Sequence, residues 1–137
     1  MTRRAVLEAF ELATDAAFDH LLSDPGFLGP ERQPGVAVYH SPSVSVEVAL
    51  DPRDGVLTLV SGQVGSHYYR AELSCLYVGA GLGAAQDVHR SARTTHELTK
   101  SLASQSRALD RLLPHLLGTQ RDDLLRGCHG RYRRTTV

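Results

Sequence analysis

The chain has 137 residues, of which 42% are hydrophobic and 22% are charged. This composition is typical of a globular domain and excludes an intrinsically disordered or collagen-like chain. Fifteen basic residues balance fifteen acidic ones, which argues against generic nucleic-acid binding, and no apolar run reaches the roughly eighteen residues that a membrane-spanning helix needs. We therefore predict one α+β domain over residues 1–127, followed by a flexible basic tail over residues 128–137.

The first predicted element is an amphipathic helix over residues 4–23, because its apolar residues recur at helical spacing. A second stripe of one base and four acids recurs at intervals of three or four residues and so follows one face of that helix: Arg4, Glu8, Glu11, Asp15 and Asp19. Asp24-Pro25-Gly26 ends the helix, and a loop is predicted as far as residue 35.

A run of candidate strands follows. Residues 36–40 are a short candidate, and residues 44–50 alternate valine or leucine with smaller or charged side chains, which is typical of a half-buried strand. The turn signal at residues 51–55 predicts a hairpin to residues 56–64. Residues 67–78 form either one more strand or a strand that ends near Glu72 and is followed by a helical turn.

Glycines at 79, 81 and 83 predict a break, after which residues 85–117 are expected to form a long helix. Serine and threonine are abundant between residues 95 and 106, so this part either is exposed or packs on another helix. A helix pair across a two-fold axis, and hence a homodimer, would suit it. We expect Pro114 to kink the helix or to start a new segment, and a short helix to follow and end before Gly127.

The predicted fold is therefore α+β, with an N-terminal helix, a three- to four-stranded antiparallel meander, and a long and a short helix on one face of the sheet. The other sheet face would be open to solvent or to a partner. Tyr68 and Tyr69 are neighbours on one strand, so one ring should enter the core and the other should be exposed beside Arg70.

Neither cysteines nor histidines indicate a metal, a cofactor or a catalytic set. Cys75 and Cys128 are too few for a disulfide scaffold, so free thiols and a cytoplasmic location are expected, and the reactivity of Cys128 stays open. His89 and His96 share a helix face, but seven residues separate their backbones by roughly 10 Å, too far for one zinc ion.

The glycine cluster at residues 79–84 matches the spacing of a dinucleotide-binding turn, but that turn needs a parallel strand after its helix and none is predicted. A weaker interpretation is a protein that binds a small ligand or anion at this break. Its candidate contacts are Gly79, Gly81, Gly83, Arg70, His89 and Arg93.

Charge segregation favours a different function. Residues 1–54 hold nine acids and four bases, whereas residues 55–137 hold six acids and eleven bases. The leading prediction is a non-enzymatic module that binds another protein, not a membrane or nucleic acid, through the acidic helix stripe and the open sheet face. In size and layout the chain is similar to many bacterial immunity and adaptor proteins. The predicted contacts are Glu8, Glu11, Asp15, Asp19, Tyr68 and Arg70.

Overall fold

The computed structural model describes residues 3–51, 53 and 55–128. A helix, α1 (Arg3–Phe18), and a 3-10 turn, η1 (Asp19–Leu22), come first. Five strands follow: β1 (Leu28–Gln33), β2 (Val36–His40), β3 (Ser45–Asp51), β4 (Gly55–Val64) and β5 (His67–Glu72). The chain ends in α2 (Leu73–Gly79), the 3-10 turn η2 (Ala85–Asp87), α3 (Thr95–Leu116) and α4 (Arg121–Cys128).

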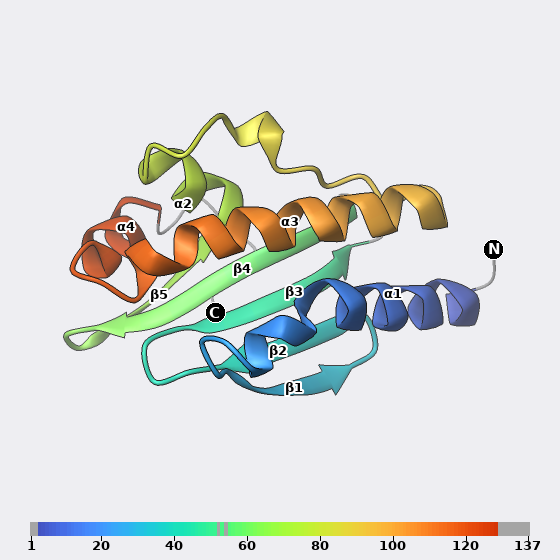
Figure 1. The fold of residues 1–137 in the computed structure, drawn as a ribbon, viewed down its shortest axis with the longest axis horizontal. Helices are drawn as coiled ribbons and strands as arrows, with labels where there is room; N and C mark the ends of the chain where they lie inside the picture. Colours follow the sequence, from blue (N-terminus) through green and yellow to red (C-terminus); the bar gives the residue numbers. More distant parts are fainter. Residues whose placement is uncertain (1–2, 52, 54, 129–137) are drawn as a thin grey trace.

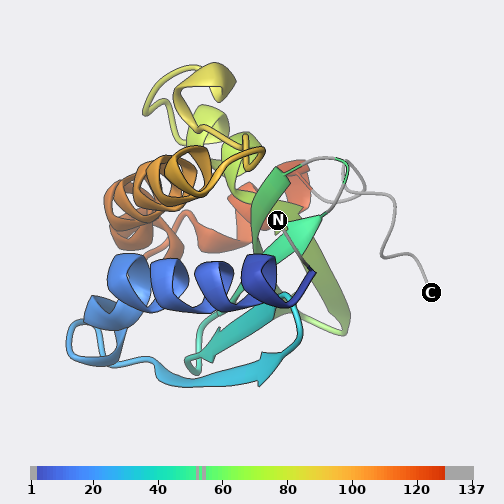
Figure 2. The same cartoon turned by 90° about the vertical axis from the view of Figure 1, so that its right-hand side faces the viewer.

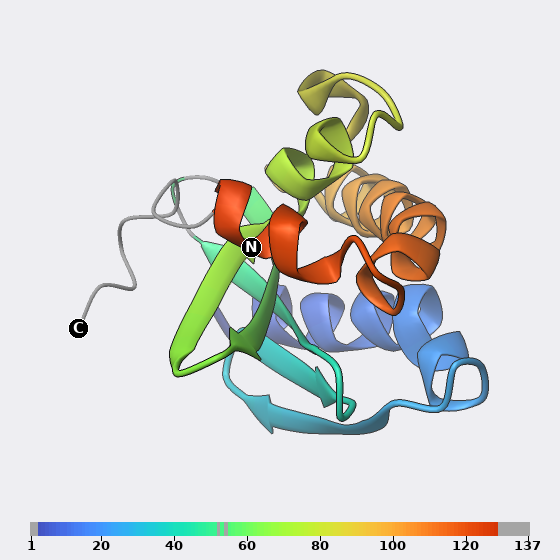
Figure 3. The ribbon, with the colours of Figure 1, turned by 90° about the vertical axis from the view of Figure 1, so that its left-hand side faces the viewer.

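The five strands form one antiparallel sheet in the order β1-β2-β3-β4-β5, a simple meander (Figure 1). The side views show the helices gathered on one side of this sheet (Figure 2 and Figure 3). The predicted α+β class, with a first helix, an antiparallel meander, a long helix and a short last helix, is confirmed.

The hydrophobic core lies between the sheet and these helices. Alternate residues of the central strands face inward and are buried, as the period of two predicted: Ala37, Tyr39, Val46, Val48, Val56 and Val60. From α1, Phe10 and Phe18 pack into the same layer, and the Phe18 and Tyr39 rings stack with centroids 6.1 Å apart. Leu102, Leu109 and Leu112 of α3 are also fully buried.

Strand β1 lies where a loop was predicted. Its sequence contains Gly29 and Pro30 and lacks alternation, so periodicity gives no strand signal. Its backbone nevertheless pairs with β2, with an irregular register between Leu28 and Glu31. Arg32 also forms an ion pair with Asp15 of α1. The sheet therefore has five strands rather than three or four.

The alternative left open after β5 is settled in favour of a helix, because α2 starts at Leu73. The prediction of one helix over residues 85–117 was wrong in its first ten residues. Helix α3 begins after Thr94, whose hydroxyl accepts a hydrogen bond from the Glu97 N–H at 3.1 Å and caps the helix. The helix then runs on through Pro114 to Leu116 rather than starting a new segment there.

The polar middle of α3 is buried rather than exposed, and part of it packs on another helix of the same chain, α1, as one of the two predicted alternatives had it. Ser101, Ser104, Gln105 and Ser106 are all buried. Ser106 donates to the carbonyl of Ala17 at 2.6 Å, and the other three bond to residues 56–58 and 87–91. The argument for a homodimer through this stretch is therefore lost.

The cysteine prediction was also wrong. Cys75 and Cys128 form a disulfide whose Cα atoms are 5.9 Å apart. Cys128, predicted as the first residue of a flexible tail, is instead the buried last residue of α4. Residues 129–137 of the predicted tail lie outside the described residues. The expected cytoplasmic location rested on free thiols and loses that support.

Candidate partner-binding surfaces

One face of the sheet carries no helix within the described residues (Figure 2). The pairing register places alternate residues of each strand on this outer face. Across the three last strands the outer neighbours are Glu47, Leu59 and Glu72 in one row, with Ser61 and Arg70 in the next. The face is therefore built by β3, β4 and β5 together, and no single sequence segment encodes it.

Tyr68 is the large side chain that stands out from this face. It is 64% exposed, yet its hydroxyl donates to the Ser61 hydroxyl of β4 at 2.8 Å. Its neighbour Tyr69 packs against the core. The predicted division of the tyrosine pair, one ring inward and one outward, is thus confirmed, and the outward ring is held in a defined orientation.

Two ion pairs cross the outer face beside Tyr68. Arg70 contacts Glu47 at 2.8 Å, with both side chains about three-quarters buried, and Arg90 contacts Glu72 at 3.3 Å. Because Glu47 and Glu72 are the cross-strand neighbours of Leu59, their carboxylates flank an apolar residue that is only 1% exposed. We call Glu47, Ser61, Tyr68, Arg70, Glu72 and Arg90 the outer-face cluster.

Arg90 reaches this cluster from the connecting segment 87–91, which lies beside the start of β4. The Val56 N–H donates to the Arg90 carbonyl at 2.9 Å. At Gly55 the two backbones approach so closely that an added Cβ would lie 1.8 Å from the Arg90 oxygen, and the φ of Gly55 is +91°. Only glycine fits this position without displacing the segment.

Helix α3 holds the other side of segment 87–91. Gln105 donates to the carbonyls of Val56 and His89 at 2.9 and 2.7 Å, and its own carbonyl accepts from the Thr58 hydroxyl at 2.7 Å. Ser101 donates to the Ser91 carbonyl at 2.6 Å. Every polar group of the buried Gln105 amide is therefore used: two bonds go to β4, and the third joins the Ser101 bond in fixing the segment that presents Arg90.

The acidic stripe of the first helix is only partly free. Glu8 and Glu11 are exposed on α1, and Asp19 is exposed in η1. Glu8 pairs with Arg4 one turn away, at 3.3 Å, and Asp15 is bound to Arg32. The hydrogen bond that the Arg32 guanidinium donates to the Asp15 carboxylate raises the pKa of Arg32. Asp15 is thus a structural contact between α1 and β1 rather than a free docking residue.

The helix stripe and the outer-face cluster lie on opposite layers of the molecule. Helix α1 packs on the inner side of the sheet (Figure 1 and Figure 3), whereas the pairing register places the strand residues of the cluster on the outer side. The structure brings Tyr68 and Arg70 together but does not bring them near Glu8, Glu11 or Asp19. One small partner cannot cover both surfaces.

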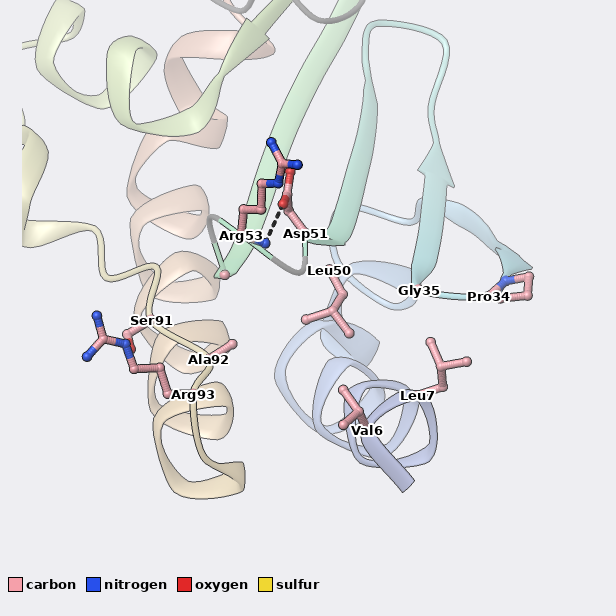
Figure 4. Close-up of a pocket in the computed structure, with 11 residues that line it drawn as sticks. Val6, Leu7, Pro34, Gly35, Leu50, Asp51, Arg53, Ser91, Ala92 and Arg93 are labelled. Carbon is pink, nitrogen blue, oxygen red and sulfur yellow. Dashed lines mark hydrogen bonds between the residues drawn. The ribbon is translucent and has the colours of Figure 1, made fainter. Parts of the chain in front are cut away.

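A cleft of about 580 Å³, lined by apolar residues together with polar ones such as Asp51 and Ser91, opens where α1 and the residues before α3 diverge. Figure 4 shows Val6, Leu7, Leu50 and Ala92 around the space, whereas the guanidinium groups of Arg53 and Arg93 point away from it. This lining suits an apolar group and gives an anion no cation inside the cleft.

The residues proposed to bind an anion are dispersed. Gly79 lines a groove between α2 and α4, His89 lines a shallow hollow beside α3, and Arg93 lines the cleft of Figure 4. Arg70 belongs to the outer-face cluster. Gly81 and Gly83 are exposed in the turn after α2 and are not among the residues that line these three spaces.

The first turn of α3 already has a carboxylate. Glu97 accepts hydrogen bonds from the Ser91 hydroxyl at 2.6 Å and from the Arg93 N–H at 3.1 Å. The Ser91 bond is the main cause of a lowered pKa for Glu97. An external anion would have to compete with this side chain for the same helix terminus.

Within residues 3–51, 53 and 55–128, no three His, Cys, Asp or Glu side chains come close enough to hold a metal ion together. The helices of that part include none with the length and apolar character needed to cross a bilayer. Comparison with protein-family models, with curated proteins and with solved structures finds no match to this chain.

Sequence reasoning found Tyr68 and Arg70 but missed Glu47, Glu72 and Arg90. The pairs Glu47–Arg70 and Glu72–Arg90 join residues 23 and 18 positions apart, so no local pattern reveals them. The alternation around Glu47 was the one usable signal, because it placed this acid on the polar face of its strand.

Proposed function

We propose that this chain is a protein-interaction module, of the immunity-like or regulatory-adaptor kind, that binds a partner protein through the outer-face cluster. The observation that carries the proposal is the state of Tyr68, whose ring is 64% exposed while its hydroxyl is fixed to Ser61. Tyrosine and arginine are the residue types that most often dominate binding energy at protein interfaces.

The surroundings of Tyr68 support this use. A side chain that is already oriented loses little conformational entropy on binding. The paired charges around it present both signs within a small area, which favours a partner with matching charges over a generic surface.

The acidic helix stripe is proposed as a second, separate docking surface for a basic partner. Leu12 stands among its acids and is 74% exposed, so the stripe combines one apolar residue with Glu8, Glu11 and Asp19. Because this surface faces away from Tyr68, the two can be occupied independently, as an adaptor requires.

The test begins with photo-crosslinking. A benzophenone side chain placed at position 68, at position 12 and, as a control, at position 107 on the exposed side of α3 is used to capture partners from the source cell. A captured protein is then purified, and its affinity for the wild-type chain is measured by calorimetry. We expect crosslinking from position 68, and an affinity lowered about 30-fold or more, or about 2 kcal/mol, by Tyr68→Ala.

Charge variants decide between the two surfaces. Arg70→Glu should weaken binding to the outer face, whereas Glu8→Lys with Glu11→Lys and Asp19→Lys should leave it unchanged. Asp15 is kept as it is, because it holds Arg32. If neither Tyr68→Ala nor Arg70→Glu changed the affinity for the purified partner, the outer face would not be the docking surface.

A second candidate function is the binding of a small apolar ligand in the cleft of Figure 4. Its volume of about 580 Å³ and its lining by Val6, Leu7, Leu50 and Ala92 favour this function over anion binding. A screen of apolar and anionic compounds by thermal shift tests it. A stabilising compound should lose its effect in Ala92→Phe, which fills the cleft, and stabilisation by anions alone would contradict it.

A further inference from the structure

The disulfide lies in the wall of an open groove. Cys75 in α2 and Cys128 at the end of α4 both line a groove of about 730 Å³ between these two helices. Cys128 is 4% exposed, and Cys75 is only partly buried. A thiol that enters the groove can therefore approach the bond from solvent while the rest of the chain stays folded, with Cys75 the more accessible cysteine.

Helix α4 depends on three attachments, one for each part of its length. At its start, Arg121 donates to the carbonyls of Ser43 and Gln63, both at 2.9 Å. In its middle, Leu125 is fully buried. At its end the disulfide to Cys75 is the covalent attachment to the neighbouring helix. Loss of that bond therefore affects the last turn and leaves the first two attachments in place.

We propose that the Cys75–Cys128 bond is a thiol-exchange site, entered through the α2–α4 groove, and that its reduction by a dithiol releases the last turn of α4. This inference is independent of the partner-binding proposal. It assigns to the groove a chemistry that does not involve the outer-face cluster.

The exchange is written in two steps. A thiolate of the dithiol attacks the Cys75 sulfur, a mixed disulfide forms, and the electron pair of the broken bond leaves on Cys128, which takes a proton from water. The second thiol of the reagent then attacks its own sulfur in the mixed disulfide and releases Cys75 as a thiolate. The dithiol loses two electrons, and the protein disulfide gains them.

Reduction changes the groove because α2 and α4 lie in direct contact beside it. An added Cβ at Gly79 would lie 3.4 Å from the Leu124 side chain, so the two helices touch there. Without the covalent bond, this packing alone holds the end of α4 against α2. The groove is then free to widen and to expose Leu124.

The first test is the rate of reduction of the folded protein. Oxidised protein is treated with dithiothreitol at several denaturant concentrations below the unfolding transition, and new thiols are counted by alkylation and mass spectrometry. We expect a rate that is proportional to dithiothreitol and independent of denaturant, because the native groove admits the reagent. A rate that rises in step with global unfolding would overturn the proposal.

A matched pair of variants on α4 shows whether the groove is the entrance. Gly127 lines the groove, and an added Cβ there meets no atom within 4 Å. We expect Gly127→Phe to obstruct access and slow native reduction by about tenfold. Arg126→Phe changes the neighbouring exposed residue, which does not line the groove, and should leave the rate unchanged. Equal rates for both variants would show that the reagent does not enter there.

The second test locates the structural response. Hydrogen exchange is measured on the oxidised and the reduced wild-type protein. At exchange times too short for global unfolding, amides near the end of α4 should exchange about tenfold faster or more on reduction, while those of α1 and β2–β4 stay protected, because only local opening contributes on that timescale. Unchanged protection in α4, or an equal loss in every element, would contradict the local release.

Discussion

Tyr39 is a fully buried residue whose hydroxyl has no hydrogen-bond partner within the described part of the chain. Burial is the main cause of a pKa raised from 10.0 to about 12, and the carboxylates of Asp15 and Asp19 add to it. An unpaired buried hydroxyl costs stability. This residue therefore gives a direct test of the packing between α1 and β2.

We expect Tyr39→Phe to leave stability unchanged at neutral pH or to raise it by up to about 1 kcal/mol. Between pH 10 and about 12 the unfolded chain releases the tyrosine proton before the folded chain does, so the wild type loses stability as the pH rises. This loss amounts to about 2 kcal/mol by pH 12, and the variant lacks it. Urea unfolding at pH 7, 9 and 11 measures both effects, and parallel pH curves for the two proteins would contradict the assignment.

Gln105 is the second residue with a decisive role, because its amide serves three partners. We expect Gln105→Leu to lower the free energy of unfolding by about 2–4 kcal/mol, since it leaves buried groups of Thr58, Val56 and His89 without a partner. Ser106→Ala removes one bond from the same helix and should cost about 1 kcal/mol. Both free energies of unfolding are measured with urea. If Gln105→Leu and Ser106→Ala lost the same amount, the Gln105 amide would not be what holds segment 87–91.

At the scale of elements, the contact of segment 87–91 with the start of β4 depends on a residue without a side chain. Gly55→Ala should destabilise the protein by about 3 kcal/mol or more, because the methyl group would overlap the Arg90 carbonyl in a backbone conformation that already disfavours alanine. Gly65→Ala is the control, since its φ is also positive but its surroundings are empty. It should cost about 1 kcal/mol, and thermal unfolding of the two variants measures the difference.

The disulfide acts on stability through the length of chain that it closes. Its cysteines are 53 residues apart, and constraint of a loop of that length in the unfolded chain is worth about 4 kcal/mol. We expect the double variant Cys75→Ala with Cys128→Ala to lose about that amount in urea unfolding, and reduced wild type to match it. If dithiothreitol left the free energy of unfolding of the wild type unchanged, the bond would not constrain the unfolded chain.

The elements that sequence predicts well are those with local signals. The alternation around Val46 and Val48 and the turn at residues 51–55 give β3 and β4, and helical spacing gives α1. Segment 85–94 was predicted as α-helix because its composition permits one, but it holds only the 3-10 turn η2, and long-range bonds from Gln105 and Ser101 fix His89 and Ser91 outside any helix. The disulfide was missed for the same reason, since nothing within reach of Cys75 in sequence indicates Cys128.

At the scale of the whole molecule, the segregation of charge seen in the sequence corresponds to two separate surfaces. The acidic first helix lies on the inner layer, while the outer-face cluster draws on later strands and on Arg90. From the sequence alone, the acidic helix stripe and the open sheet face were predicted to bind a partner together. The two surfaces are separate because the sheet is a meander. Each new strand is added beside the preceding one, always in the same direction, so β5 lies far from the end of the sheet that begins with β1.

The free edge of the first strand, β1, affects whether separate copies of the protein can pair with one another. Among the described residues no strand pairs with the far side of β1, and Pro30, which has no amide hydrogen, stands in its irregular stretch. Such an edge is a poor template for a neighbouring chain, so the protein should stay dispersed at high concentration. Pro30→Val should convert the edge into one that recruits further copies, seen as a rise in light scattering over time, and a variant that stays as dispersed as the wild type would assign that protection elsewhere.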